Sequence, residues 1–241
     1  MRHARNILFA IGLVFASSHA AAHSVWLEPD KDGKLVVGNG HPGEPVAPYD
    51  PARVTKAWAV DKDGKAVDAS ITSAGSFATV SSTTPASLYA AMFDNKYWAK
   101  GQDGKWNNGP KGTVPNPTIA GPSYKFPKTY LAPTVAYARP LGLALEIIPL
   151  SDPTTLKAGD KLQVQVLLDG KPLADADLVE NIYVDHEAKP NKVKTGKEGK
   201  ATVTVAKGSF AGVEVSHFDK QNASSVEGTF YNASLTFRVR Q

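Results

Sequence analysis

The sequence predicts an all-β protein, built of two β-sandwich-like domains that follow a cleaved signal peptide. Three observations support this fold class. Apolar and polar residues alternate with a period of two in many short runs, turn-forming residues separate these runs, and no long amphipathic helical pattern occurs. We place the signal peptide at residues 1–22, the N-terminal domain at 23–139 and the C-terminal domain at 140–241.

Residues 1–22 have the three parts of an export signal in the usual order. Arg2 and Arg5 precede an apolar stretch at 7–16, and the small residues Ala20 and Ala22 follow it. A membrane span needs about 20 apolar residues, and no later segment approaches that length. The chain has no cysteine, so it offers no disulfide and no thiol for lipid attachment. We therefore expect a free periplasmic protein with no membrane span in the mature chain.

The N-terminal domain is predicted to hold strands near residues 35–37, 54–60, 77–80 and 88–93. The pentapeptide Asp-Lys-Asp-Gly-Lys occurs twice, at 30–34 and at 61–65. A calcium loop needs a third acidic or amide ligand before the glycine and a glutamate at the twelfth position, and neither copy has both. We interpret both pentapeptides as hairpin turns.

Residues 100–133 are rich in glycine and proline, and we expect no regular structure there. Several aromatic residues lie in or beside this segment: Tyr97, Trp98, Trp106, Tyr124 and Phe126. Such rings either anchor a long loop to the sandwich or form a surface for a ligand or partner.

The C-terminal domain shows the clearest alternation. Leu162, Val164 and Val166 alternate with polar residues, and the run ends in the turn dipeptide Asp169-Gly170. Further alternating runs follow at 202–205, 213–217 and 235–239. Strand number and spacing predict an immunoglobulin-like sandwich, although the disulfide of antibody domains is absent.

The charge pattern argues against nucleic acid as a partner. Loss of residues 1–22 removes two arginines and no acidic residue, which lowers the formal charge from +4 to +2. The remaining lysines are scattered among aspartates and form no basic stripe.

Processing of the precursor would create a metal chelator at the new amino terminus. Cleavage after Ala22 makes His23 the first residue, so that its α-amine and ring Nδ1 can bind one ion. Cleavage after Ala20 instead yields Ala-Ala-His, a sequence whose nitrogens form a square-planar site for copper(II) or nickel(II).

Two further residues could complete such a site from the N-terminal domain. His41 lies in a glycine-flanked loop, where its side chain can turn toward a ligand or remain in solvent. Glu44 follows three residues later and could serve as a ligand or as a hydrogen-bond acceptor for a ligand.

The C-terminal domain contributes two histidines with different settings. His217 is in phase with Val213 and Val215, so it is either a core histidine or a third ligand that meets His23 at the domain junction. His186 lies between two acidic residues at a strand end, and we expect it at the surface.

Several segments together resemble the NikM-like periplasmic family, which is also catalogued as domain of unknown function 4198. They are His23-Ser-Val-Trp-Leu-Glu-Pro29, Gly40-His41, Glu44, and the stretches 49–54, 93–98 and 145–153. The resemblance implies a two-part β protein of the bacterial periplasm, associated with nickel or cobalt uptake and sometimes with outer-membrane receptors. His23 and His41 match the family's pattern, and His217 lies where members often carry a histidine.

The residues and the resemblance together predict a non-enzymatic protein that binds nickel or copper, with cobalt or zinc as further candidates. Its partner would be a membrane transporter or an outer-membrane receptor system. No nucleophile elbow, phosphate-binding glycine loop or His-Glu-x-x-His pair occurs. Two alternatives stay open: a cell-envelope interaction module without metal, and a copper oxidase that uses an amino-terminal histidine chelate.

Overall fold

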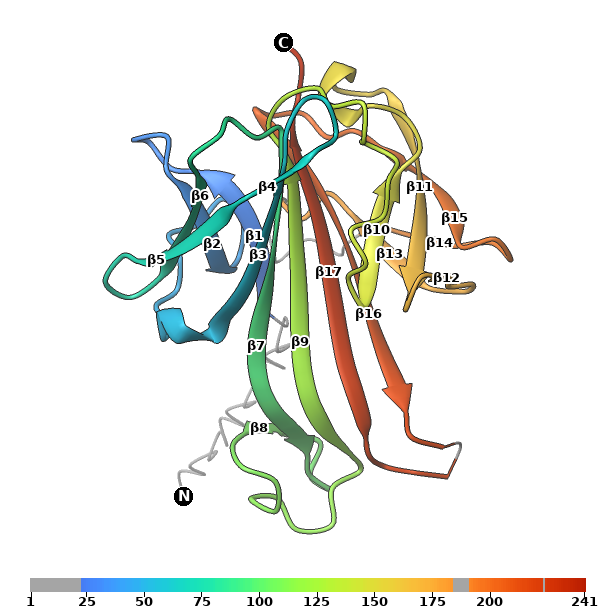
Figure 1. Cartoon of the computed structure of the whole chain (residues 1–241). Helices are drawn as coiled ribbons and strands as arrows, with labels where there is room; N and C mark the ends of the chain where they lie inside the picture. The colour runs from blue at the N-terminus through green and yellow to red at the C-terminus, as the bar shows by residue number, and fades with distance from the viewer. Residues whose placement is uncertain (1–22, 184–190, 223) are drawn as a thin grey trace, which may run out of the picture.

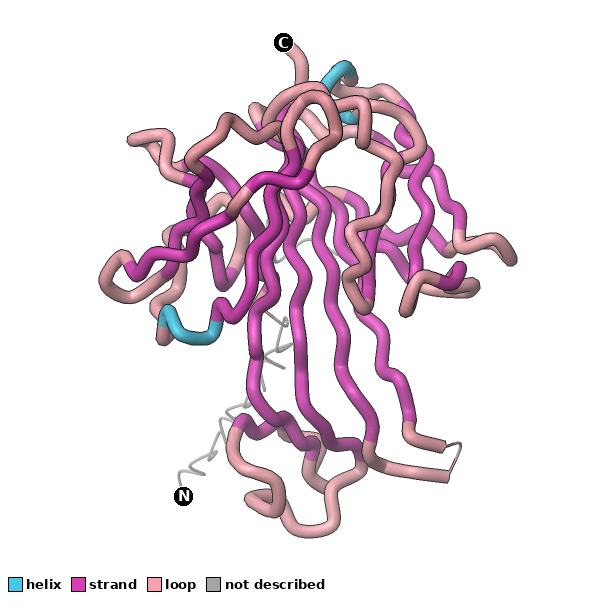
Figure 2. Tube along the Cα trace, viewed as in Figure 1, coloured by secondary structure: helices cyan, strands magenta, loops and turns pink. Residues whose placement is uncertain are grey.

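The computed structural model describes residues 23–183, 191–222 and 224–241. The predicted signal peptide and His186 lie outside these residues. Apart from two single-turn 3-10 helices, η1 (Pro51–Arg53) and η2 (Pro153–Thr155), every regular element described is a β-strand. The predicted all-β class is confirmed (Figure 2).

The strands form one large central sheet and two small ones. The central sheet has the order β14 (Lys192–Lys194), β13 (Asp177–Glu180), β16 (Phe210–Lys220), β17 (Gly228–Arg238), β9 (Ile119–Tyr130), β7 (Leu88–Lys100), β3 (Val54–Val60), β4 (Ala66–Val67), with β8 (Trp106–Asn108) paired to β7. The N-terminal small sheet has the order β1 (Ser24–Pro29), β2 (Leu35–Gly40), β6 (Ala78–Ser82), β5 (Ala69–Ser73). The C-terminal small sheet has β10 (Leu145–Pro149), β11 (Lys161–Leu168) and β12 (Lys171–Pro172), and β15 (Lys200–Thr204) also pairs with β11.

The two small sheets cover opposite faces of the central sheet. Successive residues of a strand point to opposite faces. On β7, Leu88 and Ala90 belong to the core beneath the C-terminal small sheet, whereas Ala91 and Phe93 belong to the core beneath the N-terminal one. The long strands β7, β9, β17 and β16 continue beyond both small sheets toward the lower end of the molecule in Figure 1.

The central sheet crosses the predicted domain boundary at residues 139 and 140. It takes β3, β4, β7, β8 and β9 from the N-terminal part, and β13, β14, β16 and β17 from the C-terminal part. The junction is the parallel pair of β9 and β17, in which Phe230 lies opposite Ser123 and Phe237 opposite Tyr130. The two predicted domains therefore share one sheet, and each small sheet adds a layer to it.

The prediction that residues 100–133 lack regular structure was wrong, because β8 and the whole of β9 lie in this segment. β9 accommodates its prolines where its pairing with β7 is irregular. That pairing shifts register next to Pro122 and skips Phe126 and Pro127. Pairing with two long neighbours thus outweighs the low local preference of proline for a strand.

Two of the aromatic residues of this region contact the core, and a third is partly exposed. Phe126 is buried in the core beneath the C-terminal small sheet, and Tyr124 packs against that core. Trp106 is 41% exposed, and its ring lies edge-on to Phe230 with 5.5 Å between the centroids.

An ion pair is buried where β9 meets β10. Lys128 Nζ lies 2.9 Å from Glu146 Oε1, and both side chains are at most 2% exposed. Glu146 also accepts hydrogen bonds from the backbone N–H groups of Leu141, Gly142 and Leu143. Burial lowers the pKa of Lys128, and the nearby carboxylate opposes that shift.

Lys128→Met should destabilise the protein by about 3 to 5 kcal/mol, because it leaves the Glu146 carboxylate buried without its counter-charge. Urea unfolding followed by circular dichroism measures the change. The control is Lys220→Met at the exposed end of β16, which should change stability by less than about 0.5 kcal/mol. Equal stability of the two variants would show that the buried pair does not stabilise the fold.

Among the described residues, no helix is long and apolar enough to cross a lipid bilayer.

Candidate functional site

Strand β1 lies across the central sheet with one of its edges bonded to side chains. Ser234 Oγ donates to the Val25 carbonyl at 2.6 Å, and Thr236 Oγ1 donates to the Leu27 carbonyl at 2.8 Å. Lys125 Nζ donates to the carbonyl of His23. Alternate carbonyls of a strand point to the same side, so these three bonds, the anchor bonds, close one edge of β1.

The other edge of β1 pairs with β2, and this pairing brings two histidines together. Ser24 lies opposite Gly40, so His23 and His41 follow at the same end of the hairpin. Their ring centroids are 5.4 Å apart, with the ring planes at 80°. The structure thus places His23 and His41 in direct contact, as the sequence predicted they could be.

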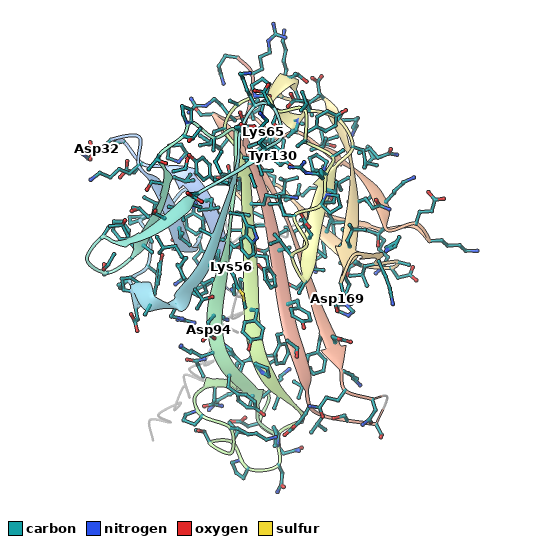
Figure 3. The ribbon with its side chains drawn as sticks, viewed as in Figure 1. Asp32, Lys56, Lys65, Asp94, Tyr130 and Asp169 are labelled. Atoms are coloured by element: carbon teal, nitrogen blue, oxygen red, sulfur yellow. The ribbon has the colours of Figure 1, made fainter. Side chains whose placement is uncertain are left out.

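The Asp30–Lys34 pentapeptide sets this register by forming the turn of the β1–β2 hairpin. Asp30 Oδ1 accepts hydrogen bonds from the N–H groups of Asp32 and Lys34. The second pentapeptide makes the same bonds through Asp61 and connects β3 to β4. Both were predicted as hairpin turns, and both predictions are confirmed. Asp32 projects from its hairpin at the edge of the molecule in Figure 3.

The loop after β2, which begins with His41, is held against the N-terminal small sheet by three hydrogen bonds. The Ala47 N–H donates to the Asn39 carbonyl at 2.8 Å. The Tyr49 hydroxyl donates to the Val37 carbonyl at 2.7 Å and accepts from the Ala78 N–H at 2.9 Å. Burial raises the pKa of Tyr49 to about 12, so this hydroxyl keeps its proton at neutral pH.

Glu44 belongs to the same turn as His41. Its N–H donates to the His41 carbonyl at 3.1 Å, and Gly43 between them has a φ of +94°. Glu44 is exposed, and its backbone bond keeps it within one turn of the histidine pair. It remains a candidate for supporting His41.

The electrostatic surroundings favour a neutral imidazole at His23. Partial burial of the ring lowers its pKa, and the nearby His41 and Lys125 lower it further. Burial also lowers the pKa of Lys125 to about 8, although the Glu214 carboxylate opposes that shift. A neutral imidazole has the free lone pair that metal binding requires.

His217 does not join this pair. It lies opposite Tyr231 on β17 and alternates with Ser216, so it shares the face of Val213 and Val215. That face lies beneath the C-terminal small sheet, whereas β1 and His23 lie on the opposite face of the central sheet. The predicted phase of His217 matches its strand, but the sheet separates it from His23.

Within the three described ranges, no set of three His, Cys, Asp or Glu side chains is placed to hold a metal ion. The two imidazoles therefore need a further donor. In a chain processed after Ala22, the α-amine of His23 would supply one beside its own ring.

Lys125 is the residue of this region that sequence reasoning missed. It was assigned to the Gly/Pro-rich loop, yet it lies in β9 and is 6% exposed. The alternation of Tyr124 and Phe126 around it is the signal that could have indicated a strand with Lys125 on the opposite face.

Trp26 is fully buried between Val25 and Leu27, the residues anchored by Ser234 and Thr236, and it packs on Gly38 of β2. A Cβ at position 38 would lie 2.3 Å from Cε2 of that ring. The close approach of the two strands therefore requires glycine at this position.

Gly38→Ala should destabilise the protein by about 1 to 3 kcal/mol through overpacking, and it should broaden the NMR signals of the β1–β2 hairpin. Gly196→Ala is the control, because a Cβ there would approach no atom closer than 3.8 Å. A Gly38→Ala protein as stable as the control would contradict the packing argument.

The chain belongs to the family described as a domain of unknown function (DUF4198), whose model matches residues 20–219. The predicted resemblance to that family is confirmed. No curated protein and no solved structure matches the chain.

Proposed function

We propose that the exported protein binds a divalent late transition metal, nickel or copper, through the His23 imidazole and α-amine together with the His41 imidazole. The observation that supports this is the contact between the two rings, whose centroids are 5.4 Å apart. Imidazoles bound through nitrogen at about 2 Å to one ion have centroids roughly 4.5 to 6.4 Å apart, depending on the angle between them. The distance between the His23 and His41 rings falls in this interval.

The donor set favours particular ions. It consists of nitrogen donors, with Glu44 in the same turn as His41, and the chain has no cysteine. Such donors suit copper, nickel, cobalt and zinc, and the Irving–Williams order makes copper the tightest binder in vitro whatever the cargo in the cell.

Delivery to an uptake system follows from the exposure of the site and from the resemblance to NikM-like proteins. His23 is exposed and His41 partly so, which leaves the ion accessible to a receiving protein. We propose a periplasmic location, with a membrane transporter or an outer-membrane receptor system as the partner. No catalytic role is part of this proposal.

The first test measures metal binding to the secreted, chelator-treated protein. Intact mass establishes whether His23 is the first residue, and nickel, copper and zinc should each raise the melting temperature. His41→Ala should weaken copper binding by about tenfold or more, because it removes one of two imidazoles.

His217→Ala is the matched control, and it should bind copper as the wild type does, because its side chain lies on the other face of the sheet. A protein that shows no thermal shift with any of the three ions would favour the interaction-module alternative instead.

Metal affinity should fall steeply between pH 7 and pH 5, since protons compete for the imidazoles and the amine. Because the pKa of His23 is lowered, its ring stays neutral to a lower pH than an ordinary histidine does. Protons therefore compete with the metal for this ring only at that lower pH. Competitive titration of copper at several pH values measures this. An affinity that stays flat over the interval would be incompatible with histidine ligation.

A further inference from the structure

We infer that Lys125 is a positioning residue, which holds the main chain of His23 so that its amine and imidazole face His41. The effect on metal binding rests on the proposed function, whereas the hydrogen bond from Lys125 to His23 is a feature of the fold. Lys125 Nζ donates a hydrogen bond to the His23 carbonyl across 102 positions of sequence.

Burial of the Lys125 side chain carries an unfavourable desolvation free energy. Its side chain is 6% exposed, and the residues opposite it on the neighbouring strands are Phe93 and Asn232. A buried ammonium group loses its hydration and needs compensating contacts. The hydrogen bond to the His23 carbonyl is such a contact, and the charge of Glu214 on the same face is another.

Comparison with Lys128 shows what is unusual about this bond. Both lysines lie on β9 and both are buried, but Lys128 reaches the opposite face and pairs with the carboxylate of Glu146. Lys125 instead reaches a main-chain carbonyl at the start of β1. The buried cation is therefore directed at the residue whose position decides the candidate chelate.

The three anchor bonds differ in whether strand pairing also fixes the residue that each of them holds. Val25 and Leu27 are also fixed by their pairing with Asn39 and Val37. His23 precedes the first paired residue, Ser24, and in the processed chain it would have a peptide bond on one side alone. Without the bond from Lys125, residue 23 would be a fraying strand end, as chain termini commonly are.

A chelate made by the amine and Nδ1 of one residue depends on how its Cα is oriented. The carbonyl carbon is bonded to that Cα, so fixing the carbonyl restricts the directions in which the amine and the ring can point. Groups that orient metal ligands in this way typically change affinity by about 10 to 100-fold when they are removed.

The competing effect is electrostatic. The ammonium of Lys125 also repels a bound divalent ion, and the nearby Glu214 carboxylate reduces that repulsion. If positioning dominates, removal of the lysine weakens metal binding. If repulsion dominates, removal strengthens it.

The test uses the secreted full-length mature protein loaded with copper(II) and read by electron paramagnetic resonance and by competitive titration. The wild type should give a single spectrum. Lys125→Met, which has a similar length and no donor, should give a mixture of spectra and about tenfold or weaker affinity. Lys125→Gln is a second variant with the same expectation, because its amide ends one atom short of the lysine Nζ.

Ser234→Ala is the matched control, since it removes the neighbouring anchor bond to Val25 without touching residue 23. It should keep the wild-type spectrum, and its affinity should stay within about threefold of the wild type. Lys125 variants with an unchanged spectrum and affinity, or with tighter binding, would overturn the inference.

A measurement without metal separates this inference from the proposed function. The heteronuclear NOE of the Ser24 amide should fall in Lys125→Met while those of Val25 and Leu27 stay high. If the wild type binds none of the metals, the proposed function fails, and this NOE alone decides whether Lys125 positions the start of β1. An unchanged value would then refute the positioning role as well.

Discussion

The position of β1 depends on hydrogen bonds that its main chain makes with side chains of the central sheet. A terminal strand paired on one side would leave its other edge open to solvent or to another chain. Here Lys125, Ser234 and Thr236 bond to alternate carbonyls of that edge. These bonds hold the first strand against β9 and against the last strand, β17, so that the two ends of the described chain lie together. They also determine where His23 lies.

The central sheet makes these contacts available. Because β9 and β17 pair in parallel, residues from two distant parts of the sequence form one polar strip beneath β1. The opposite face of the same strands carries the apolar core and the buried Lys128–Glu146 pair. On β9 and β17 the sheet thus has a polar strip that meets β1 on one face and an apolar core on the other, and each face is covered by its own small sheet. The family model spans both predicted domains, which agrees with their sharing one sheet.

The candidate site could be predicted from the sequence in part. The export signal and the glycine-flanked loop point to His23 and His41, and the hairpin register places them in contact. Alternation correctly places His217 with Val213 and Val215, but alternation shows only which residues share a face. Which of the two faces of the sheet lies toward β1 is decided by how the small sheets pack. Lys125 was missed because prolines and glycines around it suggested a loop, and long-range pairing outweighed that local preference.

The sequence by itself determined the all-β class, the two pentapeptide turns and the family, because these depend on local alternation, turn chemistry and ordered motifs. Tertiary structure alone decided that the two halves share a sheet, that His217 is separated from His23, and that Lys125 reaches the start of β1. The physical reason is that strand pairing joins residues far apart in the chain. The choice of partner depends on the packing of whole layers, which no short window of sequence contains.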